Sequence, residues 1–316
     1  MTRRRAAPAV AGVLLSAALA GLTGCATPQV AALRARPAEA LPQRVEVTAV
    51  PFFPQEEYQC GPAALAMVLT HSGPATTPEA LVPQVYLPGR EGSLQTEMLA
   101  AARRHGRVAY RVAPRLEDVL REASDGTPVI VLQNLALGFA PLWHYAVVVG
   151  YDLPREEIIL RSGTTSRAVM TLTTFERTWA RGGHWAMVAL APEQLPATAD
   201  EDRYVAAVAA LERVAPGAAR RAYTTAIERW PGNPAARIGL GNSAYALRDL
   251  PGAEAAYREA IRLHPRAADA WNNLAQTLFE LRQRDAALAA VQRAIDIGGP
   301  RLDHYRATLQ AIAESR

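Results

Sequence analysis

A spacing of 34 residues recurs through the C-terminal part of the chain. Matching apolar and small residues stand one period apart at Leu240 and Leu274, Tyr245 and Phe279, Tyr257 and Val291, Ala260 and Ala294, and Ile261 and Ile295. One period earlier, the same register holds Leu211, Tyr223, Ala226, Ile227 and Pro231. A unit of this length forms two helices that cannot bury their apolar faces alone, so neighbouring units must stack. The spacing therefore predicts an all-α array.

The residue types in this register resemble the tetratricopeptide pattern, in which Leu-Gly, aromatic residues, alanine and proline recur. The resemblance covers residues 199–316 and implies about three units, the minimum for a stable stack. It also implies a concave groove that recruits a substrate or a protein partner. The alternative is an unrelated helical bundle with an accidental period.

Residues 1–25 have the composition of a bacterial export signal. Three arginines precede an apolar segment at residues 9–19 that is too short to span a bilayer, and Leu22-Thr23-Gly24-Cys25 ends it. This ending resembles a lipoprotein box, which implies cleavage before Cys25 and attachment of acyl chains such as palmitate. Ala26 follows in place of an inner-membrane retention signal, so the resemblance implies an outer-membrane anchor that faces the periplasm. The alternative is an ordinary cleaved signal.

The segment after the export signal, residues 26–43, is rich in proline and alanine. It has little apolar periodicity, so we interpret it as a tether that separates a folded domain from the membrane.

Composition limits the function classes. The chain of 316 residues has a net charge of +4, and subtracting the three leader arginines leaves +1, so nucleic-acid binding has no support. All 34 basic residues are arginine, which removes lysine as a catalytic base. If Cys25 is acylated, Cys60 has no disulfide partner. A lone thiol in an oxidising compartment is a liability unless it is used or well buried.

Residues 51–69 combine a short apolar strand, a polar turn and a buried helix whose first turn carries Cys60. Pro62 suits the opening of a helix, because its missing N–H would have had no partner there. A thiol at a helix start faces unpaired backbone N–H groups and the positive end of the helix dipole, which favour the thiolate. The sequence thus predicts Cys60 as a nucleophile; the alternative is a small core residue.

Residues 143–151 form the strongest strand pattern. Alternation predicts Trp143, Tyr145, Val147 and Val149 on one face, and His144, Ala146, Val148 and Gly150 on the other. Because His144 shares its face with small residues only, its ring is expected to reach a helix packed on that face. A helix bearing the thiol followed by antiparallel strands predicts an α+β, papain-like domain over residues 44–192.

His144 is the best of the six histidines for the role of a base. The others are expected at helix ends, at the start of the last strand and in the repeats: His71, His105, His184, His264 and His304. No metal-ligand spacing of histidine and cysteine is present, so we expect neither a metal site nor another cofactor.

Two segments resemble the bacteriocin-processing, double-glycine-leader type of cysteine peptidase. They are Gln55 followed by Cys60-Gly61-Pro62-Ala63-Ala64-Leu65, and the run from His144 to Asp152. More narrowly, the chain resembles the lipoprotein branch in which this domain precedes tetratricopeptide repeats. The resemblance implies Cys60 as nucleophile, His144 as general base and Gln55 as oxyanion donor. Gln55 stands one residue closer to the cysteine than in the transporter-linked enzymes, so Gln59 is kept as an alternative.

The third catalytic residue departs from that family pattern. The family carries an aspartate where this chain has Ser162. A serine can hydrogen-bond to an imidazole, but it cannot stabilise an imidazolium by charge. Asp152 is a reserve, although it stands at the far end of the His144 strand and fits a turn better.

Three functions are compatible with these patterns. The first is an outer-membrane-anchored, periplasm-facing cysteine peptidase that cleaves peptide bonds through Cys60 and His144, with the repeats recruiting substrate or partner. The second is an inactive peptidase fold that serves as a scaffold for envelope protein assembly. The third is an amidase or transpeptidase acting on cell-wall peptides.

Overall fold

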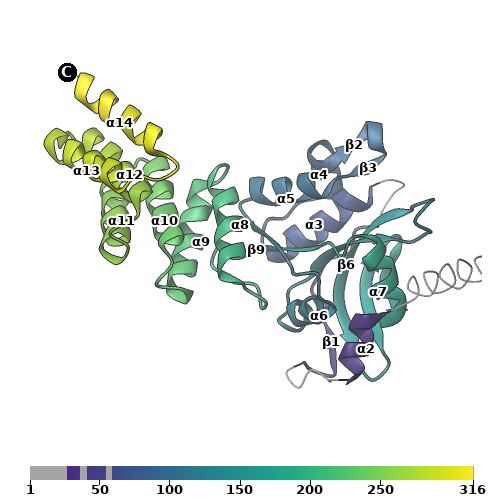
Figure 1. Ribbon diagram of the computed structural model, residues 1–316. Coiled ribbons are helices and arrows are strands. Elements are labelled where there is room, and N and C mark those ends of the chain that lie inside the picture. The colour runs from purple at the N-terminus through teal and green to yellow at the C-terminus, as the bar shows by residue number, and fades with distance from the viewer. Residues whose placement is uncertain (1–26, 36–40, 55–58, 316) are drawn as a thin grey trace, which may run out of the picture.

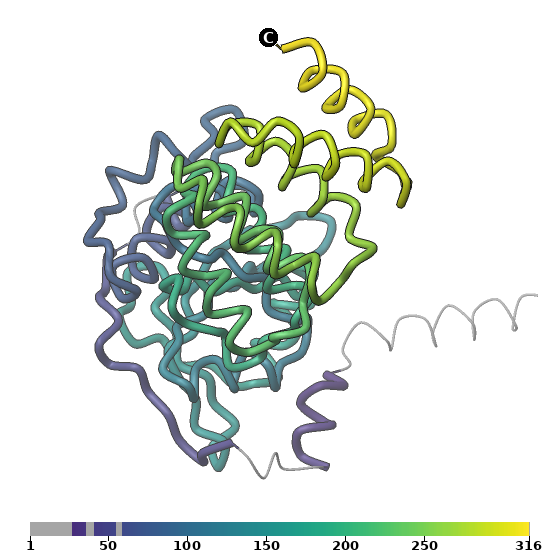
Figure 2. The backbone as a smooth tube through the Cα atoms, turned by 90° about the vertical axis from the view of Figure 1, so that its left-hand side faces the viewer, coloured from purple at the N-terminus to yellow at the C-terminus, as the bar shows by residue number. Residues whose placement is uncertain are grey.

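The computed structural model describes residues 27–35, 41–54 and 59–315. A sheet-containing N-terminal part is followed by a run of helices that extends away from it (Figure 1). The N-terminal helix α2 and the C-terminal helix α14 lie at opposite ends of the molecule (Figure 2). Within the described ranges, no helix combines the length and apolar character needed to cross a membrane. The predicted export signal lies outside the described residues.

The N-terminal part is built on a seven-stranded antiparallel sheet in the order β4–β9–β5–β6–β7–β8, with β1 paired to the end of β6. Its strands are β1 (Arg44–Glu46), β4 (Val108–Arg111), β5 (Val129–Asn134), β6 (Trp143–Asp152), β7 (Glu157–Ser162), β8 (Thr165–Thr171) and β9 (Ala186–Leu190). β6 is the longest, with 10 residues, and pairs with β5 over its first half.

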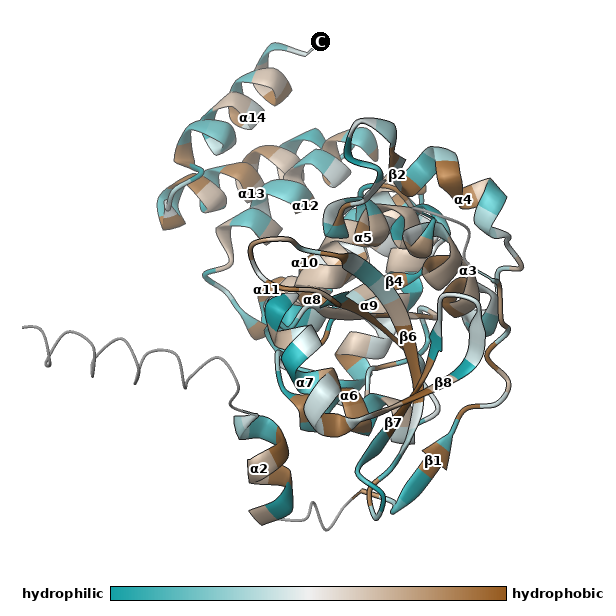
Figure 3. Cartoon of the chain, turned by 90° about the vertical axis from the view of Figure 1, so that its right-hand side faces the viewer, coloured by the Kyte–Doolittle hydropathy of each residue, from teal (hydrophilic) through white to brown (hydrophobic). Residues whose placement is uncertain are grey.

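Helices cover both faces of the sheet (Figures 1 and 3). Val131 and Val148 belong to a core with α6 (Leu116–Ser124) and α7 (Leu172–Arg181). Ile130 and Val147 belong to the opposite core, formed with α3 (Cys60–Ser72), α4 (Pro78–Val85) and α5 (Gln95–Arg104). Because both faces are buried, the central strands are mostly apolar. The predicted α+β class, followed by an all-α array, is confirmed.

A short hairpin covers the start of α3. It consists of β2 (Tyr86–Leu87), a 3-10 turn (Pro88–Arg90) and β3 (Gly92–Ser93). A Cβ at Gly61 would come within 2.3 Å of the Ser93 Oγ, so only glycine fits after the cysteine. The Cys-Gly pair of the sequence is therefore a packing requirement of this hairpin.

The predicted tether contains an ordered helix, α2 (Pro28–Ala35), which packs on α6 and α7. Val30 is buried, and its N–H and that of Gln29 donate to the Glu176 carboxylate at 2.8 and 2.9 Å. A carboxylate at this point satisfies unpaired donors of the helix start. The interpretation of residues 26–43 as a tether is therefore wrong for Pro28–Ala35. The sequence pattern missed this helix because the residue that binds its N-terminus, Glu176, is distant in sequence.

The C-terminal part stacks helices at the predicted period. They are α8 (Glu201–Glu212), α9 (Pro216–Arg229), α10 (Pro234–Ala246), α11 (Leu250–Leu263), α12 (Ala268–Glu280), α13 (Arg284–Ile297) and α14 (Leu302–Glu314). The buried rings of Tyr223 and Tyr257 lie against Gly239 and Gly241, where a Cβ would come within 2.1 and 2.5 Å of them. The aromatic and glycine positions of the repeat are thus matched by close packing between neighbouring helices.

The two parts share one hydrophobic core. Tyr204, Val208 and Leu211 of α8 belong to the same buried cluster as Val108 and Tyr110 of β4. The first repeat therefore covers the β4 edge of the sheet and is not an independent unit.

Two buried polar side chains form hydrogen bonds with residues 197–200, in the segment that connects β9 to α8. The Tyr110 hydroxyl donates to the Thr198 carbonyl at 3.0 Å and accepts the Asp200 N–H at 3.2 Å. The fully buried Glu122 carboxylate accepts the N–H groups of Ala197 and Thr198 and the Thr198 hydroxyl at 2.6 to 3.1 Å. Burial raises the pKa of Glu122, and these donors oppose that rise.

Replacing Glu122 by alanine is expected to lower the free energy of unfolding by about 2 kcal/mol, because buried donors lose their acceptor. Equilibrium unfolding in urea measures the change. The matched control is Glu117→Ala on the exposed side of the same helix, where the expected change is below about 0.5 kcal/mol. Equal effects of the two substitutions would contradict a role for Glu122 in the junction.

Candidate active site

A cleft of about 980 Å³ opens at the start of α3. Cys60 and His144, the two residues predicted to carry the chemistry, both line it. The β2–β3 hairpin and the following turn supply one wall through residues 90–95, and the end of α7 supplies another through residues 181–183. The cleft therefore brings together segments that are far apart in the sequence.

Cys60 is the first residue of α3 and is half-buried, with backbone N–H groups of Gly61 and Tyr145 near its sulfur. Burial raises the pKa of the Cys60 thiol above its ordinary value of 9.0, because desolvation outweighs the stabilising N–H groups. The helix start does supply donors, as predicted. The expectation that they would favour the thiolate overall is wrong, because the hairpin and the sheet remove water from the sulfur.

His144 reaches the cleft from an unexpected direction. The face of β6 that carries Ala146 and Val148 packs on the α6–α7 side, whereas α3 packs against Val147 and Val149 of the opposite face. The helices packed on the His144 face are thus α6 and α7, and the helix that carries Cys60 lies on the other face. His144 is the second residue of the strand, so its ring lies at the open end of the sheet and lines the cleft there.

Ser162 contacts the imidazole as predicted for the third position. Its hydroxyl oxygen lies 2.8 Å from Nε2 of His144. Burial lowers the pKa of His144, and desolvation is the single cause of that shift. Asp152 lies at the opposite end of β6, where its Oδ2 forms an ion pair with Nε of Arg44 at 2.9 Å. The reserve role considered for Asp152 is thus not supported by its position.

The remaining predicted residues are placed only in part. Gln55, the predicted oxyanion donor, and Cys25, the predicted lipid-attachment site, lie outside the described residues. Gln59 is half-buried at the residue before α3, and its side chain does not cap the helix.

Tyr145 is a site residue that the sequence patterns did not identify. Its backbone N–H approaches the Cys60 sulfur, and its hydroxyl donates to the Ser93 carbonyl at 3.2 Å. The ring packs edge-on against Trp185 with centroids 5.7 Å apart. Tyr145 thus ties the hairpin wall to the strand that carries His144. An aromatic residue in an apolar strand carries no signal for that role.

Comparison with known proteins agrees with this geometry. A model described as the Peptidase C39 like family matches residues 47–187, and a tetratricopeptide repeat model matches residues 204–264 and 238–301. The chain carries a C39-like peptidase domain followed by tetratricopeptide repeats. Both resemblances are confirmed at this level. The lipoprotein branch stays a prediction.

Similar solved structures cover one part of the chain each. A crystal structure of a C39-like peptidase from Bacillus anthracis is 19% identical over 47% of this chain and 98% of that one, with a TM-score of 0.39. The TPR2B domain of yeast Sti1, in a complex with pHsp70, is 19% identical over 33% of this chain and 87% of that one, with a TM-score of 0.32. No curated protein matches the chain.

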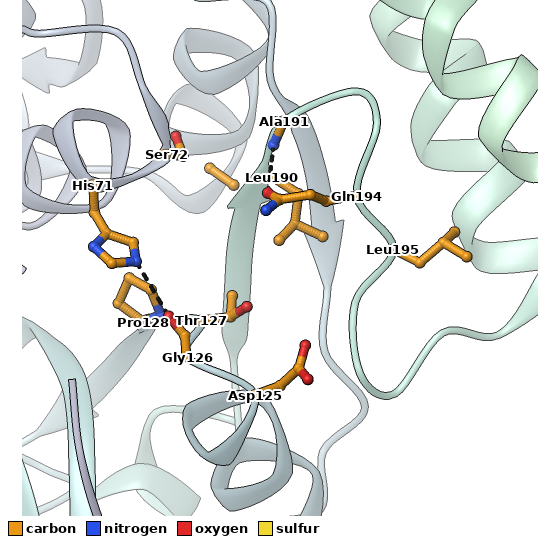
Figure 4. A pocket seen from close by; sticks show the side chains of 11 residues that line it. His71, Ser72, Asp125, Gly126, Thr127, Pro128, Leu190, Ala191, Gln194 and Leu195 are labelled. Atoms are coloured by element: carbon orange, nitrogen blue, oxygen red, sulfur yellow. Dashed lines mark hydrogen bonds between the residues drawn. The ribbon is translucent and has the colours of Figure 1, made fainter.

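A second, smaller cavity of about 270 Å³ lies where the peptidase domain meets the segment leading to the repeats (Figure 4). His71 lines it, and Nε2 of its ring lies 3.1 Å from the Gly126 carbonyl oxygen. Gln194 accepts the Ala191 N–H at 3.3 Å on the opposite side. Neither Cys60 nor His144 lines this cavity, so His71 belongs to the junction and not to the cleft at the start of α3.

The raised pKa of the Cys60 thiol predicts how its alkylation rate depends on pH. Its alkylation rate is expected to rise with pH and to reach its midpoint above that of free cysteine, because a raised pKa leaves less thiolate at every lower pH. Iodoacetamide kinetics from neutral to alkaline pH measure the midpoint. A midpoint below that of free cysteine would contradict the burial argument.

Replacing Ser162 by aspartate is expected to raise the pKa of His144, because a nearby carboxylate favours the imidazolium. The imidazolium would in turn favour the Cys60 thiolate and increase the alkylation rate near neutral pH by about tenfold, which corresponds to about one pKa unit. NMR titration of the imidazole gives an independent measurement. The control is Ser162→Asn, which has a similar size but no charge, and an equal gain in that variant would contradict the electrostatic cause.

Proposed function

We propose that the protein is a cysteine peptidase of the bacterial cell envelope, anchored by lipid at Cys25 and facing the periplasm. The observation that carries this proposal is the cleft that both Cys60 and His144 line, with the Ser162 hydroxyl 2.8 Å from the imidazole. The lipoprotein box supports the location, and Ala26 supports the outer membrane. The repeats recruit the peptide substrate or a protein partner.

The hydrogen bond to Ser162 determines how the imidazole acts. In the tautomer with its proton on Nε2, His144 donates to the Ser162 Oγ, and Nδ1 is then the basic nitrogen that can take a proton. Both members of the pair are shifted towards their neutral forms, since burial raises the thiol pKa and lowers the imidazole pKa. The proton therefore moves as the sulfur attacks, and not before.

The catalytic steps follow from these positions. The Cys60 sulfur forms a bond to the peptide carbonyl carbon while Nδ1 of His144 takes the thiol proton, and the carbonyl π electrons move to oxygen. The Cys60 N–H and Gln55 donate to that oxyanion. The C–N bond breaks as His144 returns the proton to the leaving amine. Water, deprotonated by His144, then hydrolyses the thioester and regenerates the thiol.

Labelling with a peptidyl acyloxymethyl ketone tests the proposal. The chain of residues 26–316 is expected to bind one probe molecule per chain, detected by intact mass, and Cys60→Ala is expected to bind none. The control is labelling of unfolded wild-type chain in urea, which should be slow because an isolated thiol lacks the base. Equal labelling of Cys60→Ala and wild type would overturn the proposal.

One observation favours a second candidate, a scaffold without peptidase activity. A serine replaces the acid of the family pattern, and the thiol pKa is raised. A scaffold would react with iodoacetamide at high pH but would not react faster with the peptidyl probe than its urea-unfolded form does. The same labelling experiment therefore separates the two candidates.

A further inference from the structure

An exposed apolar loop joins β5 to β6. Five of the eight exposed large apolar side chains of the described residues lie here: Leu135 at 41%, Leu137 at 60%, Phe139 at 86%, Leu142 at 59% and Trp143 at 53% exposed. Residues 134–143 include no charged side chain. A contiguous exposed cluster of this kind marks an interaction surface, whereas single exposed apolar residues do not.

Only the base of this loop lines the proposed catalytic cleft. Leu142 and Trp143 line the cleft, but Leu135, Leu137 and Phe139 do not. Exposure is greatest at Phe139, near the middle of the loop. A peptide bound in the cleft would therefore leave the tip of the loop in water.

The backbone of the loop is hydrogen-bonded internally. The Asn134 Oδ1 accepts the N–H groups of Ala136 and Leu142 at 3.0 and 2.9 Å. The Leu135 N–H donates to the Leu142 carbonyl at 2.9 Å, and the Ala140 N–H donates to the Leu137 carbonyl at 3.1 Å. Internal pairing of this kind lowers the cost of moving a loop from water into an apolar medium.

Helix α7 contacts both helix α2 and the base of this loop. Glu176 in α7 caps α2, and Arg181 at the end of α7 donates to the Asn134 carbonyl at the base of the loop, at 3.0 and 3.1 Å. Five residues of helix span about 7.5 Å. Cys25 precedes Pro28 by three residues, which can span at most about 11 Å. Acyl chains on Cys25 would thus be attached a short stretch of chain away from α2, which packs on the helix whose end contacts the loop.

We propose that residues 135–143 insert into the surface of an anionic lipid bilayer. The proposal rests on the envelope location proposed above, because it needs a membrane close to Cys25. Leu137 and Phe139 enter the acyl region, Trp143 lies at the interface, and the exposed Arg181 meets the headgroups. Arg181 forms no ion pair with any side chain in the described ranges, so its charge is available. The cleft mouth then lies at the membrane surface.

Vesicle binding by the chain of residues 26–316 tests the loop without its acyl chains. This chain keeps every described helix and strand. Sedimentation with vesicles of phosphatidylethanolamine and phosphatidylglycerol is expected to recover the wild-type chain. The double variant Leu137→Ser and Phe139→Ser is expected to bind at least about tenfold more weakly. The matched control is Leu247→Ser, an exposed leucine of the repeats that is 43% exposed, and it should bind as wild type does.

Two results would overturn the proposal: no vesicle binding by the wild-type chain, or equal binding by the double variant. If the double variant instead loses hydrolysis of soluble peptides without vesicles, the loop belongs to substrate binding and the membrane role is rejected. Cys60→Ala should bind vesicles as wild type does. Failure of the proposed peptidase activity therefore remains distinct from failure of the membrane contact.

Discussion

A chain that ends at Pro192 is expected to lose its cooperative fold, whereas a chain that ends at Asp249 is expected to keep it. The reason is the shared core: Tyr204, Val208 and Leu211 of the first repeat are buried together with Tyr110 of the sheet. Each such side chain contributes about 1.5 to 3 kcal/mol when buried. Their sum approaches the total stability of an ordinary domain, about 5 to 15 kcal/mol.

Urea unfolding of the two truncated chains, each beginning at Ala26, measures this effect. The chain that ends at Asp249 retains α8, α9 and α10, so the edge strand β4 stays covered. It therefore serves as the control for loss of the other repeats. If the chain that ends at Pro192 unfolds cooperatively at the same urea concentration as the longer one, the repeats are an independent domain and the shared core is not required.

Replacing His144 by alanine is expected to lower kcat/KM for peptide hydrolysis by about 10² to 10⁴, the usual contribution of a general base. The imidazole lines the cleft with Cys60, and no other histidine lines it. Without the base, the buried thiol has no group to take its proton during attack, and its raised pKa keeps the thiolate scarce near neutral pH.

Alkylation of Cys60 by iodoacetamide at high pH is the internal control for this variant, because it needs the thiolate and not the base. That rate is expected to change little in His144→Ala, so a parallel loss of both reactions would indicate a damaged fold. His71→Ala is the matched variant in the cavity at the junction and should retain hydrolysis. Unchanged kcat/KM in His144→Ala would remove His144 from the mechanism.

The candidate site residues could be named from the sequence because they lie in short, characteristic segments. A cysteine before Gly-Pro marked a helix start, and an alternating apolar run marked the His144 strand. Ser162 was expected at the third position only from the family resemblance, and its hydroxyl oxygen lies 2.8 Å from Nε2 of His144. The helix start and the strand depend on local spacing, which a sequence records directly.

The ionisation of Cys60 was not predictable in the same way. Local geometry favours the thiolate, but the net direction depends on how much water the β2–β3 hairpin and the sheet exclude. Which face of β6 is covered by α3 could not be predicted from the sequence either. Alternation shows which residues share a face, but both faces of this strand are apolar, so it does not show which helix covers each.

Periodicity and spacing in the sequence alone determined the α+β class, the repeat array, the helix start at Cys60 and the strand of His144, because each of these leaves a mark within a short window of residues. Only the tertiary structure decided that α2 docks through Glu176, that the first repeat completes the sheet's core and that the thiol is shifted towards its neutral form. Those properties arise from contacts between segments that are far apart in the sequence. A local sequence pattern does not show which distant segments will bury a given residue.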